Sequence, residues 1–524
     1  MKPAGKTGAQ AHVVGLPITY PWTPDQGDGS YRNPIICADY ADPDVLRHGD
    51  DFYLVASSFN CTPGLPILHS CDLVNWTIIN HAVKNLPHPR YREVQRGSGI
   101  WAPAIRFHAG KFWIFFPMPD EGIYVTTASD PAGRWSEPHL VQQGKGLIDP
   151  CPHWDDDGNA YLVHAYAWSR ARIRDKLRLC PMAPDGSRLL GEGHIVFEVP
   201  QRHPTVEGPK LLKKDGWYYI LAPAGGVATG WQTALRSRDI YGPYEEKIVL
   251  EQGSTPINGP HQGALLDLPN GEWWFIHFQD AGVYGRVLHL QPVTWEDGWP
   301  LMGCDYDGNS IGEPVPRHVK PAIGQDSAPA IPQTSDEFDS PKLGLQWQWY
   351  ANHEDDWCSL TAREGWLRLF SQHVPNADLS RVPNLLLQKF PARSFAVETL
   401  LEFAPVGLGE EAGLIVMGRA HAALAIRRAD QNNELVFRHD GTAELLQTIS
   451  SGKIRMRLSV VAGGKCVFGF AGDDGGFTPV PQAFQAEAGE WLGAKVGLYS
   501  LQPRQGPCGH ADLDYFRFSA AEGA

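Results

Sequence analysis

The chain has 524 residues with 45 Lys and Arg against 59 Asp and Glu, so its formal net charge is −14. A chain this acidic lacks the basic surface of a nucleic-acid-binding protein, and no attraction to anionic membranes is expected. No apolar run approaches the roughly 18 residues that a transmembrane helix needs. Fifty-five Gly, 43 Pro and 11% aromatic residues are typical of many short strands joined by tight turns, so the sequence predicts an all-β protein.

The N-terminal extension, residues 1–30, contains no apolar segment of the kind found in secretory signal peptides. As the sequence stands, we expect a cytoplasmic protein, although a periplasmic or secreted chain whose signal had been removed would look the same. The nine cysteines are irregularly spaced and form no CxxC pair. They indicate neither a disulfide scaffold nor a zinc site.

Residues 31–312 repeat one pattern five times: a turn with Gly or Asp, followed by an alternating strand with an aromatic residue. The copies follow one another at intervals of 48 to 60 residues, with no amphipathic helix between them. Such spacing predicts the blades of a five-bladed β-propeller, and a sandwich with similar hairpins is the alternative. The five aromatic residues are Tyr53, Trp113, Tyr161, Tyr218 and Trp274.

A short polar element with proline precedes each aromatic residue by 11 to 13 positions. In a propeller, equivalent positions of successive blades are related by rotation about the axis, so residues at the starts of the innermost strands meet at one mouth. The sequence therefore predicts a site made of three carboxylates, one Trp and one His from five separate segments. These residues are Asp42, Trp101, Asp149, Glu207 and His261.

Residues 313–335 contain five prolines and little periodicity, so they are predicted to form a Pro-rich, semi-rigid linker. From residue 336 to 524 short alternating strands return at intervals of about ten to twenty residues. This region predicts a second domain, a β-sandwich of the jelly-roll type.

Clustered carboxylates serve either metal binding or proton transfer at a glycosidic bond. Only residues 155–158 (DDDG) resemble a metal loop, and they fall at a blade hairpin where a solvated turn is the simpler interpretation. Each site residue also has a purely structural alternative. Asp42 and Asp149 precede prolines and could cap turns, His261 could be a hydrogen-bonded core histidine, and Trp101 could be ordinary core.

Six segments in order make the first region resemble glycoside hydrolase family 43, the β-xylosidases and α-L-arabinofuranosidases. The C-terminal region resembles the concanavalin-like sandwich often appended to β-xylosidases of that family. The resemblance covers nearly the whole chain beyond residue 30. The segments are NPII…ADPDVLRHGDDFYLVASSF, GIWAPAIRFHAGKFW, GLIDPCPHWDDDGNAYLV, VEGPKLLKKDGWYYI, GPHQGALLDLPNGEWW and YGRVLHLQPVTWEDGWP.

The resemblance implies a role for each carboxylate. Asp42 matches the general base, which deprotonates the attacking water, and Glu207 matches the general acid, which protonates the departing oxygen. Asp149 matches the carboxylate that orients the acid and keeps its pKa high by like-charge repulsion. The family inverts anomeric configuration, which implies an acid and a base roughly 6.5–9.5 Å apart.

The resemblance also implies contacts with the substrate. Arg286 matches an arginine that contacts sugar hydroxyls and catalytic carboxylates, and Phe59 and Trp101 match aromatic walls of the sugar pocket. His261 matches an axial histidine that faces either a calcium ion or water in the central channel. One Ca²⁺ held at His261 is therefore an expected cofactor, and no organic cofactor is expected.

Together these features predict an exo-acting, inverting glycoside hydrolase that removes terminal β-D-xylose or α-L-arabinofuranose from plant cell-wall saccharides. An endo-arabinanase and a non-catalytic carbohydrate-binding propeller are the alternatives. The expected partner is an oligosaccharide substrate, and no nucleic acid or membrane is expected. The sequence does not decide between a monomer and a homo-oligomer.

Overall fold

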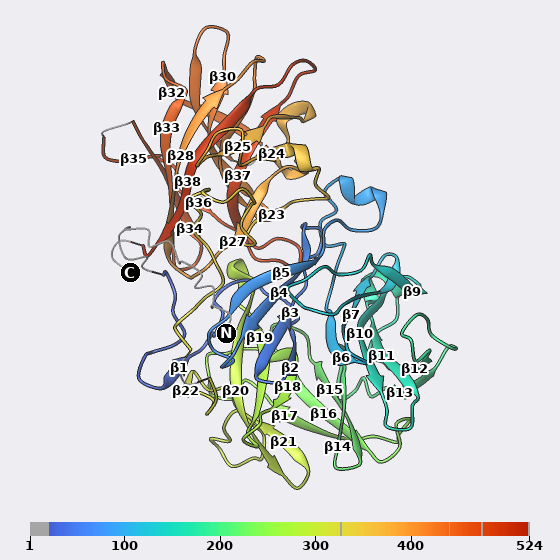
Figure 1. The fold of residues 1–524 in the computed structure, drawn as a ribbon. Helices are drawn as coiled ribbons and strands as arrows, with labels where there is room; N and C mark the ends of the chain where they lie inside the picture. Colours follow the sequence, from blue (N-terminus) through green and yellow to red (C-terminus); the bar gives the residue numbers. More distant parts are fainter. Residues whose placement is uncertain (1–19, 325–326, 440, 473–474, 522–524) are drawn as a thin grey trace, which may run out of the picture.

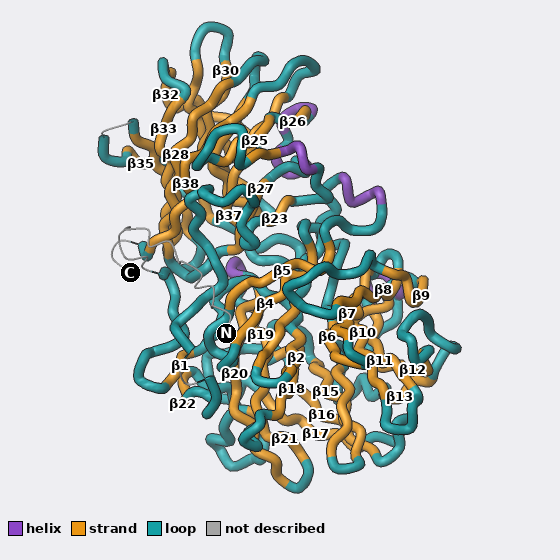
Figure 2. The backbone as a smooth tube through the Cα atoms, in the orientation of Figure 1, coloured by secondary structure: helices purple, strands orange, loops and turns teal. Residues whose placement is uncertain are grey.

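A computed structural model describes residues 20–324, 327–439, 441–472 and 475–521. The chain forms two bodies: strands from the first part of the chain surround one axis, and the orange and red strands of the second part form a separate stack (Figure 1). Helices are few and short (Figure 2). Among the described residues, no helix has the length and apolar character that crossing a membrane demands.

The first body consists of five antiparallel sheets of four strands each, and the predicted five-bladed propeller is confirmed. Each sheet is one blade, and its strands follow in chain order. Blade 1 contains β2 (Asp44–His48), β3 (Asp51–Val55), β4 (Gly64–Ser70) and β5 (Thr77–Val83). Blade 2 contains β6 (Ala104–His108), β7 (Lys111–Met118), β8 (Gly122–Ala128) and β9 (His139–Gln143). Blade 3 contains β10 (Leu147–Trp154), β11 (Ala160–Tyr166), β12 (Leu177–Met182) and β13 (His194–Phe197).

The last two blades complete the ring. Blade 4 contains β14 (Lys210–Lys214), β15 (Trp217–Ala224), β16 (Trp231–Ser237) and β17 (Glu245–Leu250). Blade 5 contains β18 (His261–Asp267), β19 (Trp273–Asp280), β20 (Arg286–Glu296) and β21 (Trp299–Met302). The five repeated aromatic residues all lie on the second strand of their blade, and the first strands β18, β2, β6, β10 and β14 contact one another in series. First strands are therefore innermost, and their starts lie at one end of the propeller.

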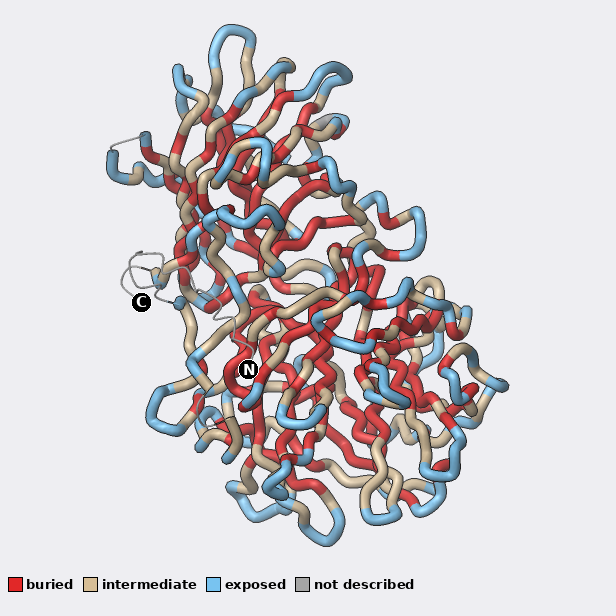
Figure 3. Tube along the Cα trace, in the orientation of Figure 1, coloured by how far each residue is buried: buried red, intermediate tan, exposed pale blue. Residues whose placement is uncertain are grey.

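Apolar side chains fill the space between neighbouring blades, and each of the five interfaces has its own cluster. Leu54 and Ile276 join blades 1 and 5, Ile67 and Ile114 join blades 1 and 2, and Phe115 and Leu162 join blades 2 and 3. Separate clusters join blades 3 and 4 and blades 4 and 5. Buried stretches follow the strands, while exposed residues concentrate at the turns (Figure 3). Burial on both faces of each blade closes the ring.

The predicted linker is not a free spacer, because it packs on the propeller. β22 (Arg317–Val319) pairs with β1 (Ser30–Arg32), which lies at the end of the predicted N-terminal extension. Further along, the Gln333 side chain exchanges hydrogen bonds with the backbone of Ile78 in blade 1. Prolines alone could not reveal this, since the linker's partners lie about 250 to 290 residues away in the sequence. Residues 1–19 of the extension lie outside the described residues.

The second domain is a sandwich of two eight-stranded sheets, as the alternating strands predict. In one sheet the order is β23 (Gln348–Trp349), β27 (Leu386–Lys389), β37 (Lys495–Gln502), β29 (Glu411–Met417), β30 (His421–Arg428), β31 (Asn433–His439) and β32 (Thr442–Ile449), with β26 (Gln372–His373) beside β37. In the other the order is β24 (Cys358–Ser359), β25 (Leu367–Phe370), β38 (His510–Ser519), β28 (Phe395–Ala404), β33 (Lys453–Val461), β34 (Lys465–Ala471) and β35 (Thr478–Pro479), with β36 (Phe484–Gln485) beside β34.

Short helical turns connect the strands of both domains. They are α1 (Trp168–Ala171) and the 3-10 turns η1 (Pro89–Arg92), η2 (Gly282–Tyr284), η3 (Asp355–Trp357), η4 (Pro375–Ala377) and η5 (Leu379–Arg381).

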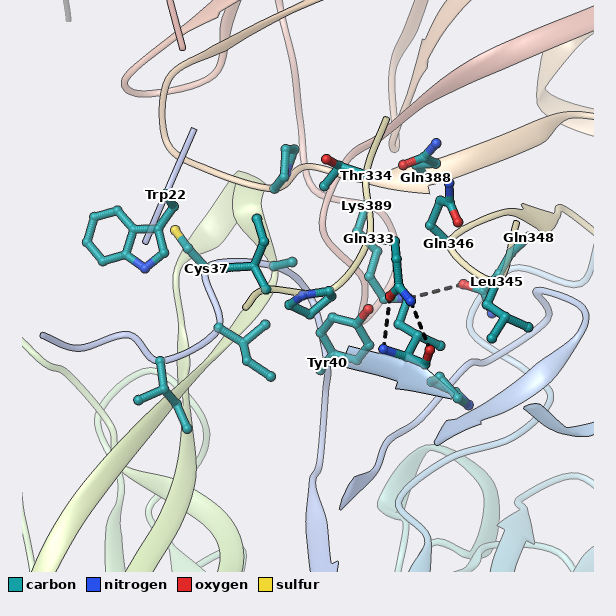
Figure 4. Close-up of a pocket in the computed structure, with 18 of the residues that line it drawn as sticks. Trp22, Cys37, Tyr40, Gln333, Thr334, Leu345, Gln346, Gln348, Gln388 and Lys389 are labelled. Atoms are coloured by element: carbon teal, nitrogen blue, oxygen red, sulfur yellow. Dashed lines mark hydrogen bonds between the residues drawn. The ribbon is translucent and has the colours of Figure 1, made fainter. Parts of the chain in front are cut away.

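The sandwich packs on one side of the propeller. Thr62 and Trp349 exchange backbone hydrogen bonds across the interface, and the Asn60 side chain donates to the Tyr350 carbonyl. A pocket at this junction is lined by both domains and by the linker (Figure 4). Inside it the ammonium of Lys389 lies 4.9 Å from the centre of the Tyr40 ring, and burial lowers the pKa of that lysine to about 7.

Candidate active site

The structure brings the five predicted polar residues to the same end of the propeller. Asp42 and Glu207 immediately precede β2 and β14, Asp149 lies near the start of β10, Trp101 precedes β6, and His261 begins β18. The five residues thus lie at one mouth, and their roles in the site stay a prediction. Connections between second and third strands end at this same mouth, because antiparallel strands reverse direction at each turn.

Backbone geometry at the site is unusual in several blades. Asp42 and Asp149 have φ values of 54° and 56°, in the left-handed region that few non-glycine residues adopt. In blade 4 the corresponding conformation falls on Gly208, which has φ of 59° and follows Glu207. Left-handed residues interrupt regular strand geometry, and at functional sites such strain re-aims side chains.

Asp42 is buried and accepts two strong hydrogen bonds, one on each carboxylate oxygen. Arg286 Nη1 donates to Oδ1 at 2.5 Å, and Ser57 Oγ donates to Oδ2 at 2.6 Å. Arg286 is itself held by its backbone N–H, which donates to Asp39 at 2.9 Å, and by the face of Phe278. A positive, fixed partner and a hydroxyl donor suit an ionised carboxylate in a defined orientation.

Asp149 and Glu207 are neighbouring acids in the site. The backbone N–H of Gly208 donates to Asp149 Oδ2 at 2.7 Å, which fixes Asp149 beside the Glu207 segment. Burial, followed by the negative charge of Asp149, raises the pKa of Glu207 to about 8. Burial, with a smaller contribution from Asp42, raises the pKa of Asp149 to about 7. At neutral pH the pair therefore holds a proton that Glu207 can donate.

His261 is fully buried beside this pair. Its Nε2 atom lies 3.5 Å from Glu207 Oε1, and neither ring nitrogen has a hydrogen-bond partner among the described residues. Burial, with the positive charge of Arg286, lowers the pKa of His261 to about 3, so the imidazole is neutral. Two unpartnered buried nitrogens fit a bound water, or a metal ion approached through water.

The donor atoms around His261 do not fit a Ca²⁺ held directly. Calcium takes six to eight oxygen ligands, whereas Glu207 supplies the one carboxylate oxygen within 4 Å of this imidazole among described residues. Only one group of three potential ligands lies close together in the described part of the chain, at Asp51, His69 and Cys71 on blade 1. The calcium ion expected at His261 thus stays a prediction.

Aromatic rings form one wall of the site. The rings of Phe59 and Trp101 lie 6.1 Å apart, and Phe59 is buried while Trp101 is partly open. The indole Nε1 of Trp101 is buried and has no hydrogen-bond partner among the described residues. A partly open aromatic ring is suited to stacking against the apolar face of a sugar.

The sandwich contributes to this wall through residues 486–494, the segment between β36 and β37. Trp491 from this segment packs edge-on against Trp101 at 6.1 Å between ring centres. Two residues later the Gly493 N–H donates to Asp39, the same carboxylate that holds Arg286. A side chain at Gly285 would collide with both Asp39 and Gly493, so this close approach requires glycine.

Sequence reasoning missed the residues that support this site. Ser57, Asp39 and Trp491 were not predicted, and neither was Arg170, whose guanidinium lies 5.2 Å from the Trp101 ring centre. Asp39 lies three residues before Asp42, and that spacing is the one local signal available. Trp491 comes from another domain 390 residues after Trp101, so no pattern within either segment connects them.

Comparison with known proteins agrees with this geometry. Residues 31–300 match the family described as glycosyl hydrolases family 43, and residues 335–519 match its beta-xylosidase C-terminal concanavalin A-like domain. The chain belongs to glycosyl hydrolase family 43. It is therefore a glycoside hydrolase with a carbohydrate substrate, and the resemblance noted from its motifs is confirmed.

Its relatives in the family are named for xylosidase and arabinofuranosidase activities. A beta-xylosidase from Formosa agariphila is 31% identical and covers 99% of this chain and 95% of its own. A protein from Xylanibacter ruminicola named for beta-xylosidase activity is 41% identical, over 90% of this chain and 86% of its own. A non-reducing end alpha-L-arabinofuranosidase from Bacteroides ovatus is 28% identical over 93% and 94%.

Two solved structures of the family match this chain along nearly their whole length. A xylan beta-1,4-xylosidase from Bacillus halodurans is 25% identical, with a TM-score of 0.80 over 93% of this chain and 99% of that one. A family 43 protein from Bacillus licheniformis is 26% identical, with a TM-score of 0.80 over 94% and 100%.

Proposed function

We propose that this family 43 enzyme is an exo-acting, inverting glycosidase that removes a terminal pentose, β-D-xylose or α-L-arabinofuranose, from plant cell-wall saccharides. The observation that carries the proposal is the split between its carboxylates. Asp42 forms an ion pair with Arg286, whereas burial and Asp149 raise the pKa of Glu207 to about 8. One charged and one protonated carboxyl is the pair that hydrolysis of a glycosidic bond needs.

In this mechanism Glu207 gives its proton to the departing glycosidic oxygen while the bond from that oxygen to the anomeric carbon breaks. Asp42 takes a proton from a water that attacks the anomeric carbon from the opposite face. Asp149 positions the acid and maintains its proton affinity. Arg286 orients Asp42 and lies where it can also contact sugar hydroxyls.

Exo action is supported by the position of the sandwich. Its residues 486–494 pack beside the aromatic wall and hydrogen-bond to Asp39 behind Arg286. A chain bound across the propeller mouth would meet this segment, whereas a chain end would not. The names of the relatives, which include a non-reducing end arabinofuranosidase, agree with attack on a chain end.

The test is hydrolysis of aryl β-D-xylopyranoside and aryl α-L-arabinofuranoside, followed by xylo-oligosaccharides and arabinan, with NMR detection of the first anomer formed. We expect single pentoses with inverted configuration. Internal cleavage products from arabinan would instead identify an endo-arabinanase, and tight binding without turnover would identify a carbohydrate-binding propeller.

We also propose that the neutral His261 holds a water in the channel and does not bind calcium directly.

We further propose a cytoplasmic location. Free thiols, which include the buried Cys61 and Cys466, support a reducing compartment and hence the cytoplasm.

A further inference from the structure

The segment 167–176 connects β11 to β12 and lies at the mouth of the propeller, on blade 3. The sandwich, residues 336–521, is hydrogen-bonded to the propeller. Among the described residues, the propeller's partners in these bonds all lie within residues 37–97 and 283–284. Blades 3 and 4 take no part in them. When the terminal sugar of a saccharide occupies the site, the rest of the saccharide can therefore extend over blades 3 and 4.

This segment contacts the aromatic wall of the active site at its start and the chain next to Glu207 at its end. At its start Arg170 contacts the Trp101 ring, donates to the Gly97 carbonyl at 2.9 Å and pairs with Asp120. At its other end Asp175 accepts a hydrogen bond from the backbone N–H of Thr205, two residues before the general acid Glu207. The segment thus lies next to the group that protonates the departing sugar.

Close to these anchors the segment carries an exposed aromatic ring and two exposed basic side chains. Trp168 is 51% exposed, and the guanidinium groups of Arg172 and Arg174 lie 5.9 and 5.4 Å from its ring centre. Arg174 shares its charge with Asp175 at 3.2 Å, whereas Arg172 makes no ion pair with a described residue. Three arginines in five positions, within WSRARIR, stand out in a chain of net charge −14.

We propose that residues 168–174 bind the leaving-group portion of the substrate and favour a saccharide that carries a carboxylate, such as a uronic acid substituent. An exposed indole ring is a stacking surface for a sugar, and arginine pairs with carboxylates through two parallel hydrogen bonds. Charge complementarity selects this occupant over a neutral chain. The inference rests on the proposed function, because it assigns the direction in which that substrate extends.

The test compares kcat/KM for a neutral xylo-oligosaccharide with kcat/KM for one of equal length that carries a uronic acid on the leaving-group side. We expect a three- to tenfold preference for the charged substrate at low salt, which falls toward one at high salt because surface charges are screened. The double variant Arg172→Gln, Arg174→Gln should lower this preference to about one. Because the readout is a ratio within each variant, partial loss of folded protein cancels.

Arg188→Gln is the control for loss of a positive charge elsewhere, since it removes one arginine from an exposed position at the other end of blade 3, and it should keep the preference. A wild-type enzyme that hydrolyses aryl glycosides but shows no charge preference would overturn this inference and leave the proposed function standing. Failure on every glycoside would refute the proposed function itself. A dimer that Trp168→Ala dissociates, without any charge preference, would make this surface an interface between copies and also overturn the inference.

Discussion

Replacement of Asp149 by Asn tests how the general acid keeps its proton. Asn has the same shape, and its side-chain oxygen can still accept the hydrogen bond from the Gly208 N–H, so the segment that holds Glu207 should keep its position. What changes is charge: the variant removes the negative neighbour that helps raise the pKa of Glu207 to about 8. Glu207 should then lose its proton more readily.

The size of the effect follows from the order of the causes. Burial is the largest cause of the raised pKa and persists in the variant, while Asp149 is the second and is removed. In the pH profile of kcat/KM, the basic limb reports the ionisation of Glu207. We expect its apparent pKa to fall by about one unit, worth about 1.4 kcal/mol, and to stay above the ordinary value for Glu.

The assay is kcat/KM against pH for an unactivated disaccharide, since a good leaving group needs little protonation. Asp156→Asn is the control, because it makes the same chemical change at an exposed position at the other end of blade 3. A basic limb that stays in place or moves to higher pH in Asp149→Asn would refute the like-charge argument.

Three further changes probe other parts of the site. Asp42→Ala should lower kcat at least 10³-fold on both activated and natural substrates, and added azide should not restore a product of retained configuration; rescue would argue against a general base. Trp491→Ala should raise KM about two- to tenfold through loss of the edge-on contact with Trp101, and an unchanged KM would remove the sandwich from the site. The raised pKa of Glu207 means that the folded state holds a proton that the unfolded chain releases, so its contribution to stability disappears as pH rises through about 8. Glu207→Gln should therefore gain stability relative to wild type between pH 6 and 9, on the order of 1–2 kcal/mol by thermal unfolding. An equal difference at both pH values would contradict the raised pKa of Glu207.

The propeller could be predicted from sequence because its signals are local. Each blade places an aromatic residue on its second strand, such as Tyr53 in β3 and Trp274 in β19, a fixed distance after a polar residue at the start of the first strand. Rotation about the axis then converts a linear repeat into a site. Asp42, Asp149 and Glu207 can thus be grouped from the sequence alone.

The support around these residues could not be predicted, because it depends on contacts between distant segments. The linker becomes a strand partner only because β22 meets β1, and Trp491 meets Trp101 only because two domains dock. A donor such as Ser57 to Asp42 leaves no pattern in the sequence. Repeats reveal symmetry, whereas docking depends on the shape of both surfaces.

The measurement that tests the central claim most directly is the response of Glu207→Ala to the leaving group. If Glu207 donates the proton, the variant should lose kcat/KM by a factor on the order of 10²–10⁴ on xylobiose and far less on an aryl xyloside whose phenol departs unaided. Equal losses on the two substrates would contradict the assignment of Glu207 as the general acid, and with it the roles proposed for Asp42 and Asp149.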